Sequence, residues 1–299
     1  MRWSPALAPD QTPRERALAG EALGQRLPPL LLAAERVAAS VAQGVHGRRR
    51  TGRGDSFWQY RPFVEGDSAR GIDWRQSARS DRHFVRETEW EAAQTAYLWV
   101  ADGEAMRWHS RGMAPKRERA VLLALALAAL LLRGGEYIRL LGAPPHPASG
   151  RAALPAVARL LDRAPGEESL PPRAGLPRHA HLILIGDFLG PLPALSAAVQ
   201  GFAGLPVSGH ILQILDPAEV DLPFRGRTRF EGVGDMLRGQ SFLVPKVEDI
   251  RAEYQARLQA QIAGVAAIAA AAGWTAGLHR TDHSPNAALL ALYEALAPR

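Results

Sequence analysis

HLILIGD, residues 181–187, carries the clearest fold signal in this chain of 299 residues. Its four central residues, Leu182 to Ile185, are all apolar and do not alternate with polar ones. A strand buried on both faces of a parallel sheet has this pattern, whereas a strand with one solvated face alternates. We therefore expect a central parallel strand that brings the carboxylate of Asp187 to the edge of a sheet.

Apolar strands and helices alternate on both sides of this run. The expected strands are Thr95–Ala101, Glu136–Gly142, His181–Gly186, His210–Leu215 and Trp274–His279. The expected helices are Lys116–Arg133, Arg151–Asp162, Leu192–Phe202, Val247–Ala272 and Asn286–Leu296. This alternation predicts an α/β fold, a three-layer, doubly wound and mostly parallel sheet with helices on both faces.

Three parts are expected along the chain. Residues 1–43 form an N-terminal helical extension, with helices at Arg14–Gln25 and Pro28–Gln43. Residues 44–94 form a segment rich in Arg and Asp, and residues 95–299 form the α/β domain. Glycines separate short apolar pieces near residues 224–244, which predicts a small antiparallel insertion in that domain.

Two of the expected strands end on a carboxylate, Asp102 and Asp187. Ligands of open α/β sheets bind outside the carboxyl ends of the strands, where the strand order reverses. If the two strands are neighbours, both carboxylates line one crevice, which suits a hard cation such as Mg²⁺. From the residues alone, the favoured alternative is that each Asp simply caps a turn or the next helix.

The segment GDSARGIDWRQSAR, residues 66–79, alternates Asp and Arg around one Trp. One interpretation is a contact face in which Arg70, Arg75 and Arg79 meet an acidic partner. The favoured one is structural: Asp and Arg residues form hydrogen-bonded ion pairs under Trp74, because bidentate Arg–carboxylate pairs satisfy both partners when water is excluded. The residues of this signature are Gly66, Asp67, Arg70, Asp73, Trp74 and Arg79.

This signature resembles that of the bacterial family known as domain of unknown function 58. The similarity continues through Phe84-Val85-Arg86, Asp102, Gly186-Asp187-Phe188, Asp216-Pro217-Ala218-Glu219 and Thr281-Asp282, and so covers roughly residues 44 to 296. The resemblance implies a fold like that of von Willebrand factor A domains. It also implies a protein partner, a MoxR-type AAA+ ATPase.

In that fold the first strand leads into a DxSxS metal-adhesion motif, and the cation accepts an acidic side chain of a partner. The corresponding residues here are Asp102-Gly103-Glu104-Ala105-Met106. Glu104 and Met106 stand where hydroxyls are expected, and a thioether is a poor ligand for Mg²⁺. We therefore expect a degenerate metal site at Asp102, Glu104 and Asp187, with Mg²⁺ or Mn²⁺ bound weakly or not at all.

Composition narrows the remaining choices. The chain has no cysteine, which excludes disulfides, thiolate metal sites and Cys nucleophiles. Lys116 and Lys246 are the only lysines among 36 basic residues, and most Arg residues are interleaved with Asp and Glu, so nucleic acid is not an expected partner. Val121–Leu132 is about half of the length needed to cross a bilayer. No membrane insertion and a cytoplasmic location are expected.

The sequence therefore predicts a non-enzymatic protein-interaction module, an adaptor or co-chaperone of a MoxR-type AAA+ ATPase, with no resident cofactor. The alternative is a divalent-metal-dependent hydrolase that uses the crevice of Asp102, Glu104 and Asp187. No nucleophile or general base that converges on this crevice is visible in the sequence.

Overall fold

The structure, a computed structural model, describes residues 36, 38, 57–64, 72–79, 83–88, 94–162, 168–232 and 239–296. By its internal contacts the chain divides into residues 44–93 and a larger unit of residues 1–43 with 94–299. The expected helix Arg14–Gln25 lies outside the described residues, as does most of Pro28–Gln43. Arg36 and Ala38, which are described, are helical, and Ala38 is buried.

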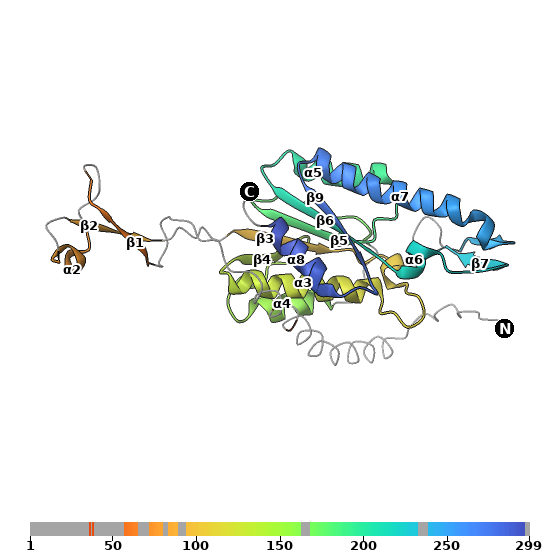
Figure 1. Cartoon of the computed structure of the whole chain (residues 1–299), viewed down its shortest axis with the longest axis horizontal. Helices are drawn as coiled ribbons and strands as arrows, with labels where there is room; N and C mark the ends of the chain where they lie inside the picture. The colour runs from red at the N-terminus through yellow and green to blue at the C-terminus, as the bar shows by residue number, and fades with distance from the viewer. Residues whose placement is uncertain are drawn as a thin grey trace. The chain divides into compact units, whose positions relative to one another are not determined.

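A five-stranded, fully parallel sheet forms the centre of the larger unit (Figure 1). Its spatial order is β4-β3-β5-β6-β9. In chain order the strands are β3 (Thr95–Val100), β4 (Tyr137–Leu140), β5 (His181–Gly186), β6 (Ser208–Leu215) and β9 (Thr275–Arg280). The predicted parallel α/β architecture is confirmed, and β5 occupies the central position that its unbroken apolar run indicated.

Helices cover both faces of this sheet in three layers (Figure 1). Helices α3, α4 and α8 lie on one face and α5 and α7 on the other, and α3 contacts both α4 and α8. Their bounds are α3 (Lys116–Arg133), α4 (Ala153–Leu161), α5 (Leu192–Ala203), α7 (Val247–Ala271) and α8 (Pro285–Ala295). The short helices η2 (Glu104–Arg107) and α6 (Pro217–Asp221) follow β3 and β6.

Helix α3 is buried over most of its length, from Ala120 to Leu131, except at Leu122. It packs between the sheet and the helices α4 and α8, so apolar residues are needed on nearly all sides rather than on one stripe. This environment explains the apolar run of the sequence without a lipid bilayer. Within the described parts of the chain, none of the helices combines the length and apolarity that a bilayer crossing requires.

Strand ends differ from the sequence expectation by one or two residues. Strand β6 begins at Ser208, two residues early, because Ser208 and Gly209 continue the parallel ladder with His181 and Leu182 of β5. Strands β7 (Thr228–Glu231) and β8 (Ser241–Val244) pair as an antiparallel two-stranded sheet inside the region expected to hold a small insertion.

The unit of residues 44–93 contains an antiparallel pair, β1 (Phe57–Pro62) and β2 (Phe84–Thr88). A short helix, α2 (Trp74–Ser77), lies between them in the chain. The buried hydroxyl of Ser77 donates to the carbonyl of Asp73 (2.7 Å) and accepts the amide of Phe84 (2.9 Å). These two bonds attach α2 to the start of β2.

Candidate functional site

The strand order of the main sheet reverses between β3 and β5. From β3 the chain crosses through α3 to β4 on one side, and it then returns through α4 to β5 on the other. Asp102 follows Ala101 at the carboxyl end of β3, and Asp187 directly follows β5. The structure therefore places both carboxylates at the position where α/β sheets bind ligands.

Each of the two carboxylates is paired with a basic residue at the start of α3. Asp187 accepts a hydrogen bond from Lys116, and Asp102 accepts one from Arg117. Consecutive residues of a helix point about 100° apart, so the two cations direct their partners to different sides. Asp102 lines a pocket of about 240 Å³ beside β4, and Asp187 is not among its lining residues. The two aspartates thus follow neighbouring parallel strands, as expected, and each is engaged by a different basic residue of α3.

Lys116, in the more buried of the two ion pairs, lies between two carboxylates. Its Nζ is 2.9 Å from Oδ2 of Asp187 and 2.5 Å from Oε1 of Glu219, and its side chain has no exposed surface. Burial by itself lowers the pKa of Lys116, but the charges of the two carboxylates outweigh this effect and the pKa is raised above 10.5. Lys116 is therefore charged inside the protein at neutral pH.

Glu219 is held by α6, which begins directly after β6. Asp216 caps this helix: its Oδ1 accepts the amide of Ala218, and its Oδ2 accepts the amide of Ser110. In return, Oε2 of Glu219 accepts the amide of Asp216 (2.8 Å), which completes a capping box. One carboxylate oxygen of Glu219 thus accepts a backbone amide, and the other accepts a hydrogen bond from Lys116.

Burial raises the pKa of Glu219, and the nearby charge of Lys116 offsets only part of this effect. The hydroxyl of Tyr254 on α7 donates to the carbonyl of Glu219 (2.7 Å), and burial raises the pKa of Tyr254 to about 12. The amide of Gln213 donates to the carbonyl of Asp187 (2.8 Å). We call Lys116, Asp187, Asp216 and Glu219 the lysine–carboxylate cluster.

The pair of Arg117 and Asp102 is more open to water. The two side chains are 21% and 20% exposed. Arg117 also donates to the carbonyl of Leu161 (2.6 Å), at the end of α4, and the guanidinium of Arg107 donates to the carbonyl of Asp102 (3.1 Å). The carboxylate of Asp102 is therefore bound by Arg117, its backbone carbonyl is bound by Arg107, and the pair lies beside solvent.

The residues that stand in for the metal-adhesion hydroxyls both lie in η2. Met106 is buried in the core, and Glu104 is half-buried. Among the described residues, no cluster of three or more His, Asp or Glu side chains is arranged to hold a metal ion. The donor set that the resemblance implies does not fit a divalent cation here, because Lys116 and Arg117 already occupy its two aspartates.

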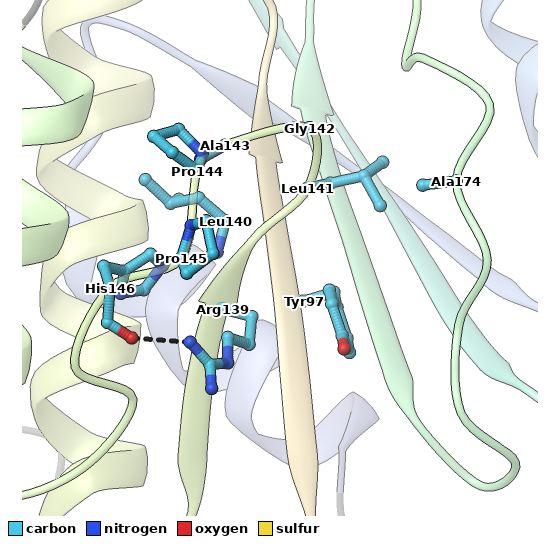
Figure 2. Close-up of a pocket in the computed structure, with 10 residues that line it drawn as sticks. All are labelled: Tyr97, Arg139, Leu140, Leu141, Gly142, Ala143, Pro144, Pro145, His146 and Ala174. Atoms are coloured by element: carbon cyan, nitrogen blue, oxygen red, sulfur yellow. Dashed lines mark hydrogen bonds between the residues drawn. The ribbon is translucent and has the colours of Figure 1, made fainter.

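A second pocket, of about 300 Å³, lies beside the edge strand β4 (Figure 2). Tyr97 of β3 and Arg139 of β4 are register partners that line it. Arg139 donates to the carbonyl of His146, and the imidazole of His146 accepts the amide of Leu140 (3.2 Å). The loop after β4 therefore hydrogen-bonds along the outer edge of the sheet.

The Arg/Asp/Trp signature belongs to the smaller unit. Gly66, Asp67 and Arg70 lie outside the described residues. The side chain of Trp74 is 62% exposed and makes an edge-on ring contact with His83. The indole of Trp74 is therefore largely solvated, and the predicted ion pairs of Asp67 and Arg70 fall outside the described residues. Asp73 is half-buried, and Arg79 is exposed.

Sequence reasoning missed Lys116 and Glu219 as members of the site. Two signals were present. Lys116 is one of two lysines in a chain that otherwise uses Arg, and it stands at the first turn of the helix after β3. Asp216-Pro217-Ala218-Glu219 has the spacing of a capping box, which fixes the direction of the Glu side chain.

The fold and the site define a class: a three-layer α/β protein with a parallel five-stranded sheet and a buried lysine–carboxylate cluster at its carboxyl edge. The chain belongs to the family described as "Protein of unknown function DUF58", whose profile matches residues 59–264.

Two solved structures are similar at low levels. One is an aerotolerance-related membrane protein from Bacteroides fragilis, with a TM-score of 0.37, 15% identity, and coverage of 68% of this chain and 98% of that one. The other is BatB from Bacteroides thetaiotaomicron, with a TM-score of 0.36, 15% identity, and coverage of 69% and 98%. No curated protein matches the chain.

Proposed function

We propose that this chain is a non-enzymatic protein-interaction module, an adaptor or co-chaperone of a MoxR-type AAA+ ATPase. The observation that carries the proposal is the surface around Trp74. Trp74, Arg75 and Arg79 are all exposed on α2 and the turn after it. Trp and Arg are the side chains enriched at the energetic centres of protein interfaces. Two guanidinium groups beside an indole favour an acidic partner surface.

The carboxyl edge of the main sheet supports the same proposal. A metal-dependent hydrolase would need Asp102 and Asp187 as ligands, but each is engaged by a basic residue of α3. Exchange of Lys116 for a metal ion would leave a buried ammonium group without its partners, which costs several kcal/mol. Nothing specific therefore favours the hydrolase over the adaptor.

We also propose that the α/β unit is von Willebrand A-like. The strand order β4-β3-β5-β6-β9 and the two aspartates after β3 and β5 support this likeness. Because an AAA+ partner consumes ATP, the proposed meeting place is the cytoplasm.

Direct binding to the purified MoxR-type ATPase from the same host tests the proposal. We expect the wild-type chain to bind, and the double variant Arg75→Glu/Arg79→Glu to bind at least about tenfold more weakly, because reversed charges repel an acidic surface. Trp74→Ser is expected to weaken binding by a similar factor. The measurement is a titration by calorimetry, with circular dichroism to confirm that each variant is folded.

Arg257→Glu is the matched control, because Arg257 is an exposed Arg on α7 of the other unit and pairs with Glu253 on the same helix. This variant should bind like the wild type. If the wild-type chain and the ATPase do not bind when each is present at about 100 μM, any affinity between them is weaker than that of specific complexes. This result would contradict the proposed partnership.

A further inference from the structure

The cation of the lysine–carboxylate cluster is a lysine, a residue type that this chain rarely uses. Only two of the 36 basic residues are lysines, and one of them is fully buried at the ligand-binding edge of the sheet. An ammonium group is a compact point charge, whereas guanidinium is a wide planar fork. Nζ of Lys116 therefore presents a compact charge to the two carboxylates beside it.

The oxygen atoms around Nζ come from separate segments, as they do in metal sites. Asp187 follows β5, and Glu219 belongs to α6, which follows β6. The N–O distance to Asp187, 2.9 Å, exceeds Ca²⁺–oxygen distances of about 2.3–2.6 Å by roughly 0.3–0.6 Å, and the distance to Glu219, 2.5 Å, lies within that range. The carboxylates would need to move little to meet a metal ion.

The charges around Nζ do not balance. One ammonium faces two carboxylates, Asp187 and Glu219, whose side chains are only 11% and 15% exposed. A divalent cation would neutralise both groups, and the space of the lysine side chain would hold the water molecules that such ions retain. Asp216 adds a further carboxylate nearby, but its two oxygens are engaged by backbone amides.

We propose that Nζ of Lys116 is a built-in replacement for the divalent cation at this edge of the sheet, so that the protein works without metal and removal of Lys116 creates a divalent-cation site at Asp187 and Glu219. The ligand class of that latent site is a hard cation with oxygen coordination: Mg²⁺, Mn²⁺ or Ca²⁺. The inference concerns the chain alone and does not depend on the proposed ATPase partner.

Titration of the isolated full chain with Mn²⁺ tests the proposal. Binding is measured by calorimetry and by the electron paramagnetic resonance signal of free Mn²⁺. The wild type is expected to bind with a Kd in the millimolar range or weaker. Lys116→Ala is expected to bind one Mn²⁺ at least about tenfold more tightly, and about 1 mM Mn²⁺ should raise its melting temperature by several degrees. The melting temperature of the wild type should be unchanged by Mn²⁺ and by a chelator.

Arg117→Ala is the matched control, because it removes the neighbouring positive charge from the same turn of the same helix. It should bind Mn²⁺ as weakly as the wild type, since it leaves Lys116 in place between Asp187 and Glu219. The double variant Lys116→Ala/Asp187→Asn should lose the gained binding, which locates the ion.

Three results would overturn the proposal: micromolar Mn²⁺ binding by the wild type, a folded Lys116→Ala protein that binds no better than the wild type, or equal gains in Lys116→Ala and Arg117→Ala. If Lys116→Ala is unfolded without metal, recovery of its circular dichroism spectrum in about 5 mM Mn²⁺ supports the proposal, and failure to recover contradicts it.

Discussion

Two neighbouring ion pairs at the carboxyl edge of the sheet differ in how deeply they are buried. Lys116 and Asp187 form a buried pair, completed by Glu219, whereas Arg117 and Asp102 form a pair in which each side chain is about one-fifth exposed. Both cations are consecutive residues of α3, and both carboxylates end adjacent strands. The difference in environment, not in local sequence, decides what each pair contributes.

Burial makes the first pair costly to break. A charge left alone in a low-dielectric interior loses its partner and also lacks water, whereas an exposed charge is rehydrated. The partly exposed pair of Arg117 and Asp102 keeps contact with solvent and lines a pocket of about 240 Å³. The comparison therefore teaches that Lys116 organises the core of the site, while Arg117 borders its surface.

Removal of each cation in turn should produce the largest difference in stability between the two pairs. Lys116→Met leaves Asp187 and Glu219 buried without their counterion, so the free energy of unfolding is expected to fall by about 3–5 kcal/mol. Arg117→Met should cost about 1–2 kcal/mol, because it removes a partly exposed ion pair and one hydrogen bond to Leu161. Urea denaturation followed by circular dichroism measures both values. Equal losses in the two variants would mean that burial does not distinguish the pairs.

Alkaline pH provides a second, smaller contrast. Because the folded-state pKa of Lys116 is raised, its contribution to stability is fully present below 10.5 and is lost as the pH rises through the folded-state value. The stability of the wild type should therefore fall by up to about 1.4 kcal/mol per pH unit above pH 10.5 on this account. Lys116→Met should lose this part of the slope, and Arg117→Met should keep it.

Tyr254 contributes in the same direction, because its pKa is raised to about 12 and its neutral form is favoured by folding. Tyr254→Phe separates its share of the alkaline slope from that of Lys116. The measurement is a set of denaturation curves between about pH 9 and 12, a range that includes the ordinary pKa values of tyrosine and lysine. A slope in Lys116→Met as steep as that of the wild type is the result that this prediction does not allow.

Salt should produce the smallest effect and sharpen the comparison further. Raising NaCl from about 0.1 to 1 M shortens the Debye length from about 10 to 3 Å, which screens exposed charges far more than buried ones. In double-mutant cycles, the coupling energy of Arg117 with Asp102 should therefore fall by at least about half, and that of Lys116 with Asp187 should change little. The reverse order of salt sensitivity would contradict the burial that separates the pairs.

The parallel architecture was predictable because it depends on local patterns. The unbroken apolar run of Leu182 to Ile185 indicated a strand with two buried faces, and β5 is the middle strand of the sheet. Strand ends were less predictable: Ser208 and Gly209 join β6 because β5 lies beside them, which no pattern within those two residues indicates.

The positions of Asp102 and Asp187 were also readable, since each directly follows an apolar run. Their partners were not. Lys116 is 71 residues from Asp187 and 103 residues from Glu219 along the chain, and their meeting depends on which strands are neighbours. Likewise, the signature around Trp74 was visible as a pattern, but the pattern did not distinguish a buried ring from an exposed one.

The amino-acid sequence by itself therefore determined the strands and helices, the alternation that makes the sheet parallel, and the two carboxylates at strand ends. These features depend on backbone periodicity and burial, which act over a few residues. Only the tertiary structure decided that the ammonium group of Lys116 meets both Asp187 and Glu219. Electrostatic pairing acts through space, between groups that the fold brings together from distant parts of the chain.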